Sequence, residues 1–509
     1  MSVTKSMARP ERFSVSRSVP EIGDSHAHHV NSSPVTNGAF MRVHSFVKKL
    51  SLLFCFLFCT VTAASPQAPP VTARPDIDDI VTKALAASGV PSVSVAIVEG
   101  GKLTYVKAYG QARLDPPLPA RTDMRYSIGS ISKQFTAAAI LMLAEEGKLS
   151  LDDHVEKFVP GLTRGNEITV RQLLSHTSGY QDYWPQDYVP PFMLATVTPQ
   201  KIVERWARKP LDFEPGARWQ YSNTNFVIAG MIVDKASHMP FLDFLRQRIF
   251  KPLHMESVAD IDQNTLAATD ATGYFRYALG PPRVAPKEGK GWLFAAGELA
   301  MTAADLQKWN IALLQKGLLK PSSYKELETE THLKDGSGTN YSLGIRVNHL
   351  NGHLILQHTG EVSGFTGASV VLPDDGVAVV VLVNQDAVDA ASVIIRAIVA
   401  KLVAINPPPE PERDERVKKI LEGLAHGQID RALFSDNGNA YFSDVALKDY
   451  AASLSPLGAV ENVRQTSTGK RGGMTFWDYT ARYSGKAVAI SVYALPDGKI
   501  EQFLVSPQQ

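Results

Sequence analysis

The spacing of apolar side chains predicts a helix and then a hairpin at the start of a large domain. Residues 76–88 place apolar side chains at the intervals of an amphipathic helix, and Gly89 follows at a position typical of a helix end. Residues 93–98 and 103–109 are rich in β-forming side chains, and Glu99-Gly100-Gly101-Lys102 lies between them. This pattern predicts two antiparallel strands joined by a tight turn.

Strand-like segments return only after a long helical stretch, which runs from about residue 130 to residue 315. They are residues 341–347, 353–357, 366–372 and 377–383. Asp375-Gly376 supplies a tight turn between the last two, and residues 387–403 follow as an apolar helix. Strands at both ends with helices between them predict an α/β (α+β) fold, in which helices flank an antiparallel sheet that has a helical insertion. We expect this domain to span residues 76–404, with a site between the sheet edge and the insertion.

A proline-rich stretch separates the large domain from the C-terminal part of the chain. Pro407-Pro408-Pro409-Glu410-Pro411 is stiff and cannot continue a helix, so residues 405–415 are predicted to be a linker. Residues 416–509 begin with a helical segment, and strand-like runs follow at residues 475–483, 487–493 and 499–505. This segment is predicted to be a small α+β domain, and it carries no recognisable chemical motif.

The N-terminal region has the order of a secretory signal. Residues 50–64 form a short apolar run, with basic residues before it and small residues near its end. We expect a signal peptide at residues 41–64 and a linker at 65–75, while residues 1–40 are a disordered extension or reflect a misassigned start. The mature protein is then periplasmic or secreted, without stable membrane insertion. An uncleaved membrane anchor is the alternative.

Composition narrows the chemistry further. Hydrophobic residues make up 44% of the chain and charged residues 20%, and the net charge of +1 favours neither nucleic acid nor an anionic membrane as a partner. Both cysteines, Cys55 and Cys59, lie in the apolar run, so the mature protein has no disulfide and no thiolate nucleophile. No metal-binding motif occurs, and we expect neither metal nor cofactor. The sequence leaves the oligomeric state open.

A serine followed by a lysine three residues later suggests nucleophilic catalysis. Ser130-Ile131-Ser132-Lys133 opens a predicted helix, which would place both side chains on one face. The positive end of a helix favours a neutral lysine, and a neutral lysine can take the proton of a serine hydroxyl. The same spacing recurs at residues 2–5, 45–48, 322–325 and 467–470, so the spacing alone carries little weight.

The surroundings of Ser130 resemble the class C β-lactamase and D,D-peptidase family of penicillin-recognising serine hydrolases. The matching blocks, in family order, are residues 126–137, 147–153, 168–179, 215–223, 295–299 and 358–360. The resemblance covers about residues 75 to 404. It implies a β-lactamase/transpeptidase-like fold and an acyl-enzyme mechanism.

The resemblance also implies a role for each matching residue. Ser130 forms the acyl-enzyme, Lys133 accepts its proton, and Tyr221 relays a proton to the leaving group. An oxyanion would lie between the backbone N–H groups of Ser130 and Glu361, which are fixed before charge develops. The implied substrate-binding residues are Asn223, His358, Thr359 and Gly360. A tyrosine needs a nearby cation to act as a base, and Lys133 could provide it.

Several positions depart from the family pattern. His358 stands where most β-lactamases of this type carry lysine, and a largely neutral histidine would hold a substrate carboxylate less firmly. Glu361 replaces a small residue and adds negative charge near the cleft. Glu298 replaces a common glycine, for which we have no interpretation. His176 matches a family position, where we expect a structural role in a loop.

The leading hypothesis is therefore a serine hydrolase of the D,D-peptidase, D-aminopeptidase or esterase kind, acting on a small peptide or ester. A β-lactamase that hydrolyses β-lactam antibiotics is the first alternative, because amide and ester hydrolysis share one acyl-enzyme route. A penicillin-binding sensor or scaffold that does not turn over is the second, because a fold alone does not establish a function.

Overall fold

The computed structural model describes residues 73–184, 186–188, 190–277, 280–350, 352–403, 411–471 and 474–507. The predicted extension, signal peptide and both cysteines lie outside these residues, as do most of the two predicted linkers. Within the described part of the chain, no helix combines the length and the apolar character needed to cross a bilayer.

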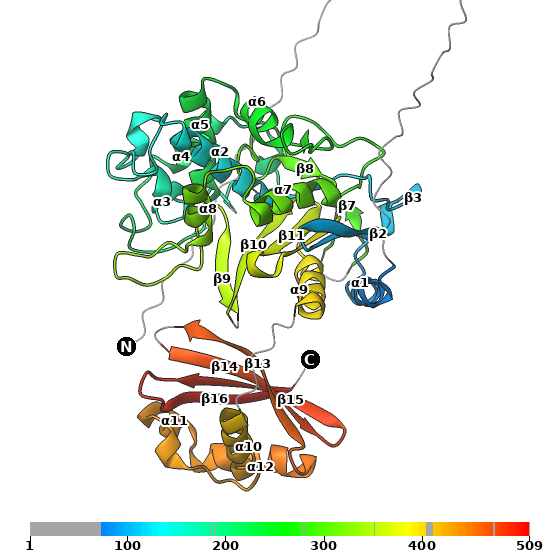
Figure 1. Ribbon diagram of the computed structural model, residues 1–509, viewed down its shortest axis with the longest axis vertical. Coiled ribbons are helices and arrows are strands. Elements are labelled where there is room, and N and C mark those ends of the chain that lie inside the picture. Colours follow the sequence, from blue (N-terminus) through cyan, green and yellow to red (C-terminus); the bar gives the residue numbers. More distant parts are fainter. Residues whose placement is uncertain are drawn as a thin grey trace, which may run out of the picture. The chain divides into compact units, whose positions relative to one another are not determined.

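An antiparallel sheet of seven strands forms the centre of the large domain, in the order β3-β2-β1-β12-β11-β10-β9 (Figure 1). The strands are β1 (Ser92–Glu99), β2 (Lys102–Leu114), β3 (Pro117–Pro119), β9 (Arg346–Leu350), β10 (His353–Val362), β11 (Phe365–Leu372) and β12 (Val377–Val383). β1 pairs with β12, so strands from the two ends of the domain meet at the middle of the sheet. The predicted antiparallel sheet with helices on its faces is confirmed.

Alternate side chains of β1 and β12 face two separate hydrophobic cores. One core contains Val93, Val95 and Ile97 of β1 and is covered by α1 (Pro75–Ser88) and α9 (Ala390–Leu402). The other contains Ala96 and Val98 and is continuous with the helical insertion. α7 (Ala303–Gln315) packs on this second face of the sheet. Both strands are therefore buried on both sides, which explains their nearly continuous apolar sequences.

The insertion between β3 and β9 is mainly helical. Its helices are α2 (Lys133–Glu145), α3 (Val170–Leu174), α4 (Pro199–Trp206), α5 (Asn223–Ser237), α6 (Phe241–Leu245), α7 and α8 (Pro321–Glu328). Two small sheets accompany them, formed by β4 (Tyr126–Ser127), β8 (Leu299–Met301) and β5 (Ala259–Asp260), and by β6 (Tyr274–Phe275) and β7 (Arg283–Val284).

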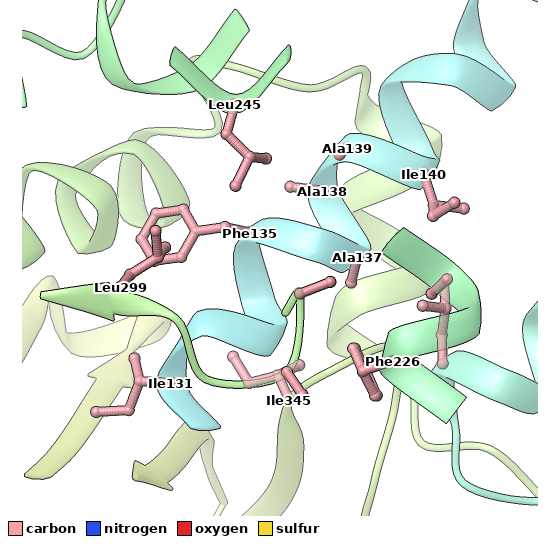
Figure 2. Packing of buried hydrophobic residues seen from close by; sticks show 14 of the residues in the cluster. Ile131, Phe135, Ala137, Ala138, Ala139, Ile140, Phe226, Leu245, Leu299 and Ile345 are labelled. Carbon is pink, nitrogen blue, oxygen red and sulfur yellow. The ribbon is translucent and has the colours of Figure 1, made fainter. Parts of the chain in front are cut away.

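Helix α2 is buried on every side from its first residue to Leu143 (Figure 2). Phe135 packs against Phe250 and Trp309, with ring centroids 5.5 and 4.9 Å apart. Burial of one such side chain stabilises a fold by about 1.5 to 3 kcal/mol. The core therefore fixes the position of α2 and of the residue that begins it.

One predicted strand is wrong in its position. The sequence suggested a strand at residues 341–347, but β9 begins only at Arg346. The chain turns first, with the N–H of Ser342 donating to the carbonyl of Ile345, and Gly344 has φ of +72°. A Cβ atom at Gly344 would lie 2.7 Å from the carbonyl oxygen of Lys133. The apolar pattern reflected this close approach to α2 rather than a strand.

The C-terminal module contains α10 (Pro411–Ala425), α11 (Asp436–Tyr441), α12 (Asp444–Leu454) and the sheet β13 (Asn462–Arg471), β14 (Met474–Tyr483), β15 (Lys486–Ala494) and β16 (Ile500–Pro507). It has its own core, in which Leu421, Tyr479 and Phe503 are buried. The predicted linker at residues 405–415 is too long, because α10 already begins at Pro411. Proline is compatible with the first helical position, where its missing N–H costs nothing.

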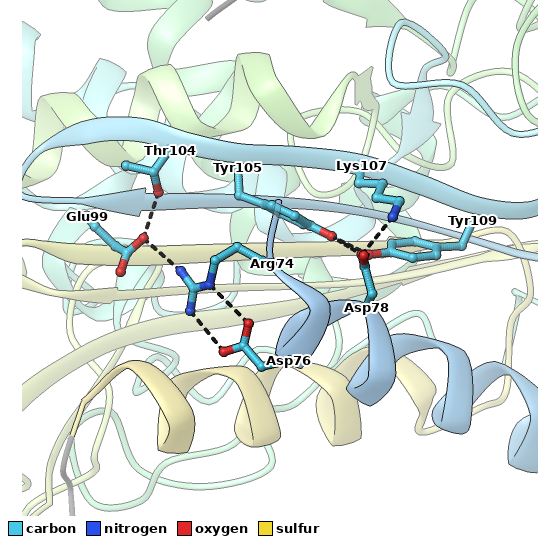
Figure 3. A network of polar contacts seen from close by, with 8 residues as sticks. All are labelled: Arg74, Asp76, Asp78, Glu99, Thr104, Tyr105, Lys107 and Tyr109. Atoms are coloured by element: carbon cyan, nitrogen blue, oxygen red, sulfur yellow. Dashed lines mark hydrogen bonds and ion pairs between the residues drawn. The ribbon is translucent and has the colours of Figure 1, made fainter. Parts of the chain in front are cut away.

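A polar cluster fastens α1 to β2 (Figure 3). Asp78 of α1 accepts hydrogen bonds from the hydroxyls of Tyr105 and Tyr109, each at 2.6 Å, and from the amine of Lys107 at 2.8 Å. Lys107 and the two tyrosines hold the pKa of Asp78 at about 2. Because this pKa lies below the ordinary value of 3.8, the ionised carboxylate stabilises the folded state.

We expect Asp78→Asn to lower the free energy of unfolding at pH 7 by about 1 to 2 kcal/mol, a value discounted for the partial exposure of the side chain. The contribution of Asp78 is complete above pH 3.8 and is lost as the pH falls towards 2, so the difference from the wild type should close over that interval. Urea unfolding at several pH values measures it. Asp79→Asn is the control, because the one ion pair of Asp79 among the described residues is with the exposed Lys83. Equal effects of the two substitutions would contradict a special role for the cluster.

Candidate active site

Ser130 lies on a one-turn 3-10 helix (Gly129–Ser132) that leads directly into α2. Strand β10 presses against this turn, since a Cβ atom at Gly360 would lie 1.8 Å from the carbonyl oxygen of Ile128 and 3.1 Å from the nitrogen of Ser130. Only glycine permits this approach. The next residue of β10, Glu361, contributes its N–H at the same edge, where a Cβ atom on Gly129 would lie 2.6 Å from the Glu361 nitrogen. The two backbone groups implied as an oxyanion site are thus brought together.

Lys133, the first residue of α2, is completely buried and places its amine between three oxygen atoms. Its Nζ lies 2.9 Å from Ser130 Oγ, 2.8 Å from Asn223 Oδ1 and 2.7 Å from the carbonyl oxygen of Ala296. Burial lowers the pKa of Lys133 to about 7, against an opposing effect of Asp182. A substantial fraction of Lys133 is therefore neutral near pH 7.

The geometry fixes the direction of the lone pair of this neutral amine. A neutral amine has two N–H donors and one acceptor position, and the two carbonyl-type oxygens of Asn223 and Ala296 can only accept. They take both hydrogens, and the lone pair is left facing the hydroxyl of Ser130. The arrangement can therefore remove the proton of Ser130.

Tyr221 lies two residues before the start of α5, with its hydroxyl oxygen buried and without a hydrogen-bond partner among the described residues. Burial raises the pKa of the phenol, and the neighbouring hydroxyl of Ser130 lowers it in part. The Lys133 amine lies 5.0 Å from the centre of the Tyr221 ring. The Tyr221 hydroxyl therefore lies in the cleft wall beside Ser130, where a reacting group can contact it.

The ring of His176 packs against the ring of Tyr221. A capping box between Thr169 and Gln172 starts α3, and the loop after this helix carries His176 with φ of +58°. The buried His176 ring packs 4.2 Å from the Tyr221 ring, and its Nδ1 accepts from the N–H of Ser222. Burial holds its pKa well below the ordinary range, so the ring is neutral.

His358 on β10 is buried and uses both ring nitrogens within the protein. Nδ1 donates to the carbonyl of Thr359 at 2.6 Å, and Nε2 accepts from the hydroxyl of Tyr341 at 2.9 Å. Burial and the proximity of Lys133 lower the pKa of His358 to about 3. The residue therefore offers no cation to the cleft, whereas Thr359 is exposed there.

The cleft over these groups has a volume of about 820 Å³. The aromatic residues Tyr183, Trp184 and Tyr188 line it. Two acidic residues also line it, Glu361 of β10 and Asp386 in the loop between β12 and α9. Glu361 is held in place because its Oε1 accepts from the N–H of Ala387 at 2.9 Å.

Glu298 lies outside this lining, fully buried beside Asp260 and Asp262. Burial and these neighbours raise the pKa of Glu298 well above its ordinary range, so its carboxyl is neutral.

Sequence reasoning missed two charged residues at the site. Arg346 lines the cleft with its guanidinium carbon 5.3 Å from the ring centre of Trp219 and 5.8 Å from that of Tyr341, and it has no ion pair among the described residues. Asp182 contacts Asn223 and is close enough to Lys133 to raise its pKa. Neither residue belongs to a motif, and only three-dimensional proximity reveals them.

The large domain is similar to known proteins. A family model described as Beta-lactamase matches residues 77–402. Protein flp of Staphylococcus aureus is 29% identical over 322 residues, which are 60% of this chain and 62% of that protein. The chain thus spans less than two thirds of the length of this curated relative.

Two solved structures share the fold. A D-stereospecific amidohydrolase from Streptomyces sp. is 30% identical with a TM-score of 0.57, over 64% of this chain and 98% of that one. An octameric penicillin-binding protein homologue from Pyrococcus abyssi has a TM-score of 0.58 at 22% identity, over 85% of this chain and 99% of that one. The second likeness concerns fold alone, and it covers a larger share of the chain than the family match.

Proposed function

This chain belongs to the beta-lactamase family, and from that premise we propose that it is a serine hydrolase that cleaves amide or ester bonds through an acyl-enzyme on Ser130. The main support is the amine of Lys133, which is neutral in part near pH 7 and has its lone pair directed at Ser130 Oγ. The D-stereospecific amidohydrolase from Streptomyces sp., at 30% identity, is one of its structural relatives.

The proposed acylation step uses each group once. Ser130 Oγ attacks the carbonyl carbon while its proton passes to Lys133 Nζ, and the N–H groups of Ser130 and Glu361 receive the oxyanion. The Tyr221 hydroxyl passes its proton to the leaving nitrogen or oxygen as the scissile bond breaks. The proton that Lys133 took from Ser130 then replaces it on Tyr221. Water then attacks the acyl-enzyme by the same route in reverse, which releases a carboxylic acid and restores Ser130.

The polar groups of the cleft favour peptide-like substrates. His358 is neutral and has both nitrogens engaged, so it cannot serve as the cation that a lysine provides at this position. Two arginines line the cleft, Arg276 and Arg346. The guanidinium of Arg276 donates to the side chain of Gln385 and to the carbonyl of Gly89, whereas Arg346 has no ion pair among the described residues and stacks near Trp219 and Tyr341. Guanidinium binds carboxylates well. We therefore assign Arg346 to the carboxylate of the leaving group and Asn223 and Thr359 to the amide chain of the acyl part.

The activity is placed ahead of the two alternatives for specific reasons. A β-lactam antibiotic would find His358 in place of the lysine that binds its carboxylate. It would also lie close to the carboxylate of Glu361, beside the oxyanion site. A non-catalytic sensor would not require both a partly neutral Lys133 and the hydroxyl of Tyr221 next to Ser130. We place the chemistry in residues 76–404 and none in residues 416–509, and export by residues 41–64 stays a prediction.

Labelling by a fluorophosphonate tests the nucleophile. The full chain should gain one adduct mass, and Ser130→Ala should gain none. Ser132→Ala is the matched control, because Ser132 is buried two residues away and its Oγ accepts from the N–H of Leu299. Intact-mass spectrometry followed by peptide mapping gives the readout. Persistent labelling of Ser130→Ala at another residue would refute the assignment.

Removal of the Arg346 charge tests the substrate. Arg346→Ala should lower kcat/KM about 10- to 100-fold for a peptide that ends in a D-amino acid carboxylate, as expected for loss of one charge-assisted contact. The same peptide with a C-terminal carboxamide is the control and should lose much less. If both peptides lose activity equally, Arg346 does not read the carboxylate.

A further inference from the structure

Asp182 contacts the first residue of α5 rather than the cleft. Its Oδ1 accepts from the backbone N–H of Asn223 at 2.9 Å and from that of Trp184 at 3.2 Å. Its Oδ2 accepts from the side-chain Nδ2 of Asn223 at 3.2 Å. Asp182 forms no ion pair with any residue that the structure describes. The first N–H groups of a helix have no partner within the helix, so an anion is favoured at this place.

The carboxylate of Asp182 determines which way the amide of Asn223 faces. An asparagine side chain has an oxygen that accepts and a nitrogen that donates. Because a carboxylate only accepts, the Asn223 nitrogen must face Asp182, and its oxygen then faces the amine of Lys133 at 2.8 Å. In the reverse orientation, the Asn223 nitrogen would donate into the lone pair of Lys133, and two oxygens would oppose each other at Asp182.

We propose that Asp182 is a positioning residue for the proton transfer from Ser130 to Lys133: acting through the amide of Asn223, it keeps the lone pair of Lys133 free for the serine. This inference rests on the proposed function of Ser130 as the nucleophile. Asp182 touches neither substrate nor reacting atoms in this role.

The charge of Asp182 has a second effect on the same lysine. Burial raises the pKa of Asp182 to about 6, so it is mostly ionised at neutral pH. The ionised carboxylate raises the pKa of Lys133, which burial lowers. Among the described residues, Tyr221, His176 and His358 also lie near Lys133, and both histidines are neutral at pH 7. The guanidinium of Arg346 acts on these three groups in turn. Asp182 is therefore the anion whose removal should move the acid limb of the reaction.

Asp182→Asn in the full chain tests the proposal at nearly constant shape. The new amide can present a nitrogen to Asn223, which then turns and donates to Lys133. We expect acylation of Ser130 by the fluorophosphonate to slow about 100-fold, the low end of a general-base contribution. The acid limb of the residual rate should also move to lower pH, because Lys133 loses its nearby anion.

A second aspartate in the same segment provides the control. Asp187 is also buried, accepts from Trp206 Nε1 at 2.7 Å and pairs with Arg205 at 3.0 Å, but it does not contact Asn223. Asp187→Asn should acylate within about threefold of the wild type, with an unchanged acid limb. A loss as large as that of Asp182→Asn would mean that both residues only support the loop, and it would overturn the proposal.

Asn223→Ala closes the test as a double-mutant cycle. If Asp182 acts through Asn223, Asp182→Asn should add little to the loss caused by Asn223→Ala. The same factor in both backgrounds, or a wild-type rate for Asp182→Asn alone, would overturn the inference.

If Asp182→Asn does not fold, Asp182→Glu keeps the carboxylate and should acylate within about tenfold of the wild type, with the wild-type acid limb. A rate as slow as that of Asn223→Ala would contradict the inference. A wild-type chain that forms no adduct overturns the proposed function and this inference together. A reactive wild type with an unaffected Asp182→Asn overturns the inference alone.

Discussion

The amine of Lys133 is buried and forms no ion pair with any carboxylate in the described part of the chain, and the rest of the site depends on this burial. Taking an ammonium group out of water is costly, so burial favours the neutral form. Two acceptors, Asn223 Oδ1 and the carbonyl of Ala296, then use its hydrogens and leave one direction for its lone pair. That direction points to Ser130. A solvated lysine at the same spacing would be protonated and would have no fixed orientation.

The fold supplies the rigid parts that this arrangement needs. The hydrophobic core holds α2 and therefore Lys133, while α5 carries Asn223 and the turn before β8 carries Ala296. Strand β10 comes close enough at Gly360 to bring a second backbone N–H to the serine. Each segment belongs to a different part of the chain, and the sheet and its helical insertion bring them together.

The sequence predicted the parts whose signal is local. Apolar periodicity located α1, the first hairpin, β11, β12 and the helical insertion, and the resemblance of the blocks identified the residues that the structure gathers at Ser130. The roles of these residues stay predictions. The shift of β9 was missed because Gly344 packs against α2, and β13 was missed because few apolar residues alternate along it. The contact of Asp182 with the Asn223 side chain, that of Arg346 with Trp219 and the bond of His358 Nε2 to Tyr341 each join residues far apart in the sequence. No local pattern reports such contacts.

The most direct test of this account is the titration of Lys133 itself, followed by NMR of side-chain-labelled lysine and assigned by comparison with Lys133→Arg. The account predicts a Lys133 pKa of about 7, separated from those of the exposed lysines. A Lys133 amine that stays protonated up to its ordinary pKa of 10.5 would contradict it, because no lone pair would then be available to Ser130 near neutral pH.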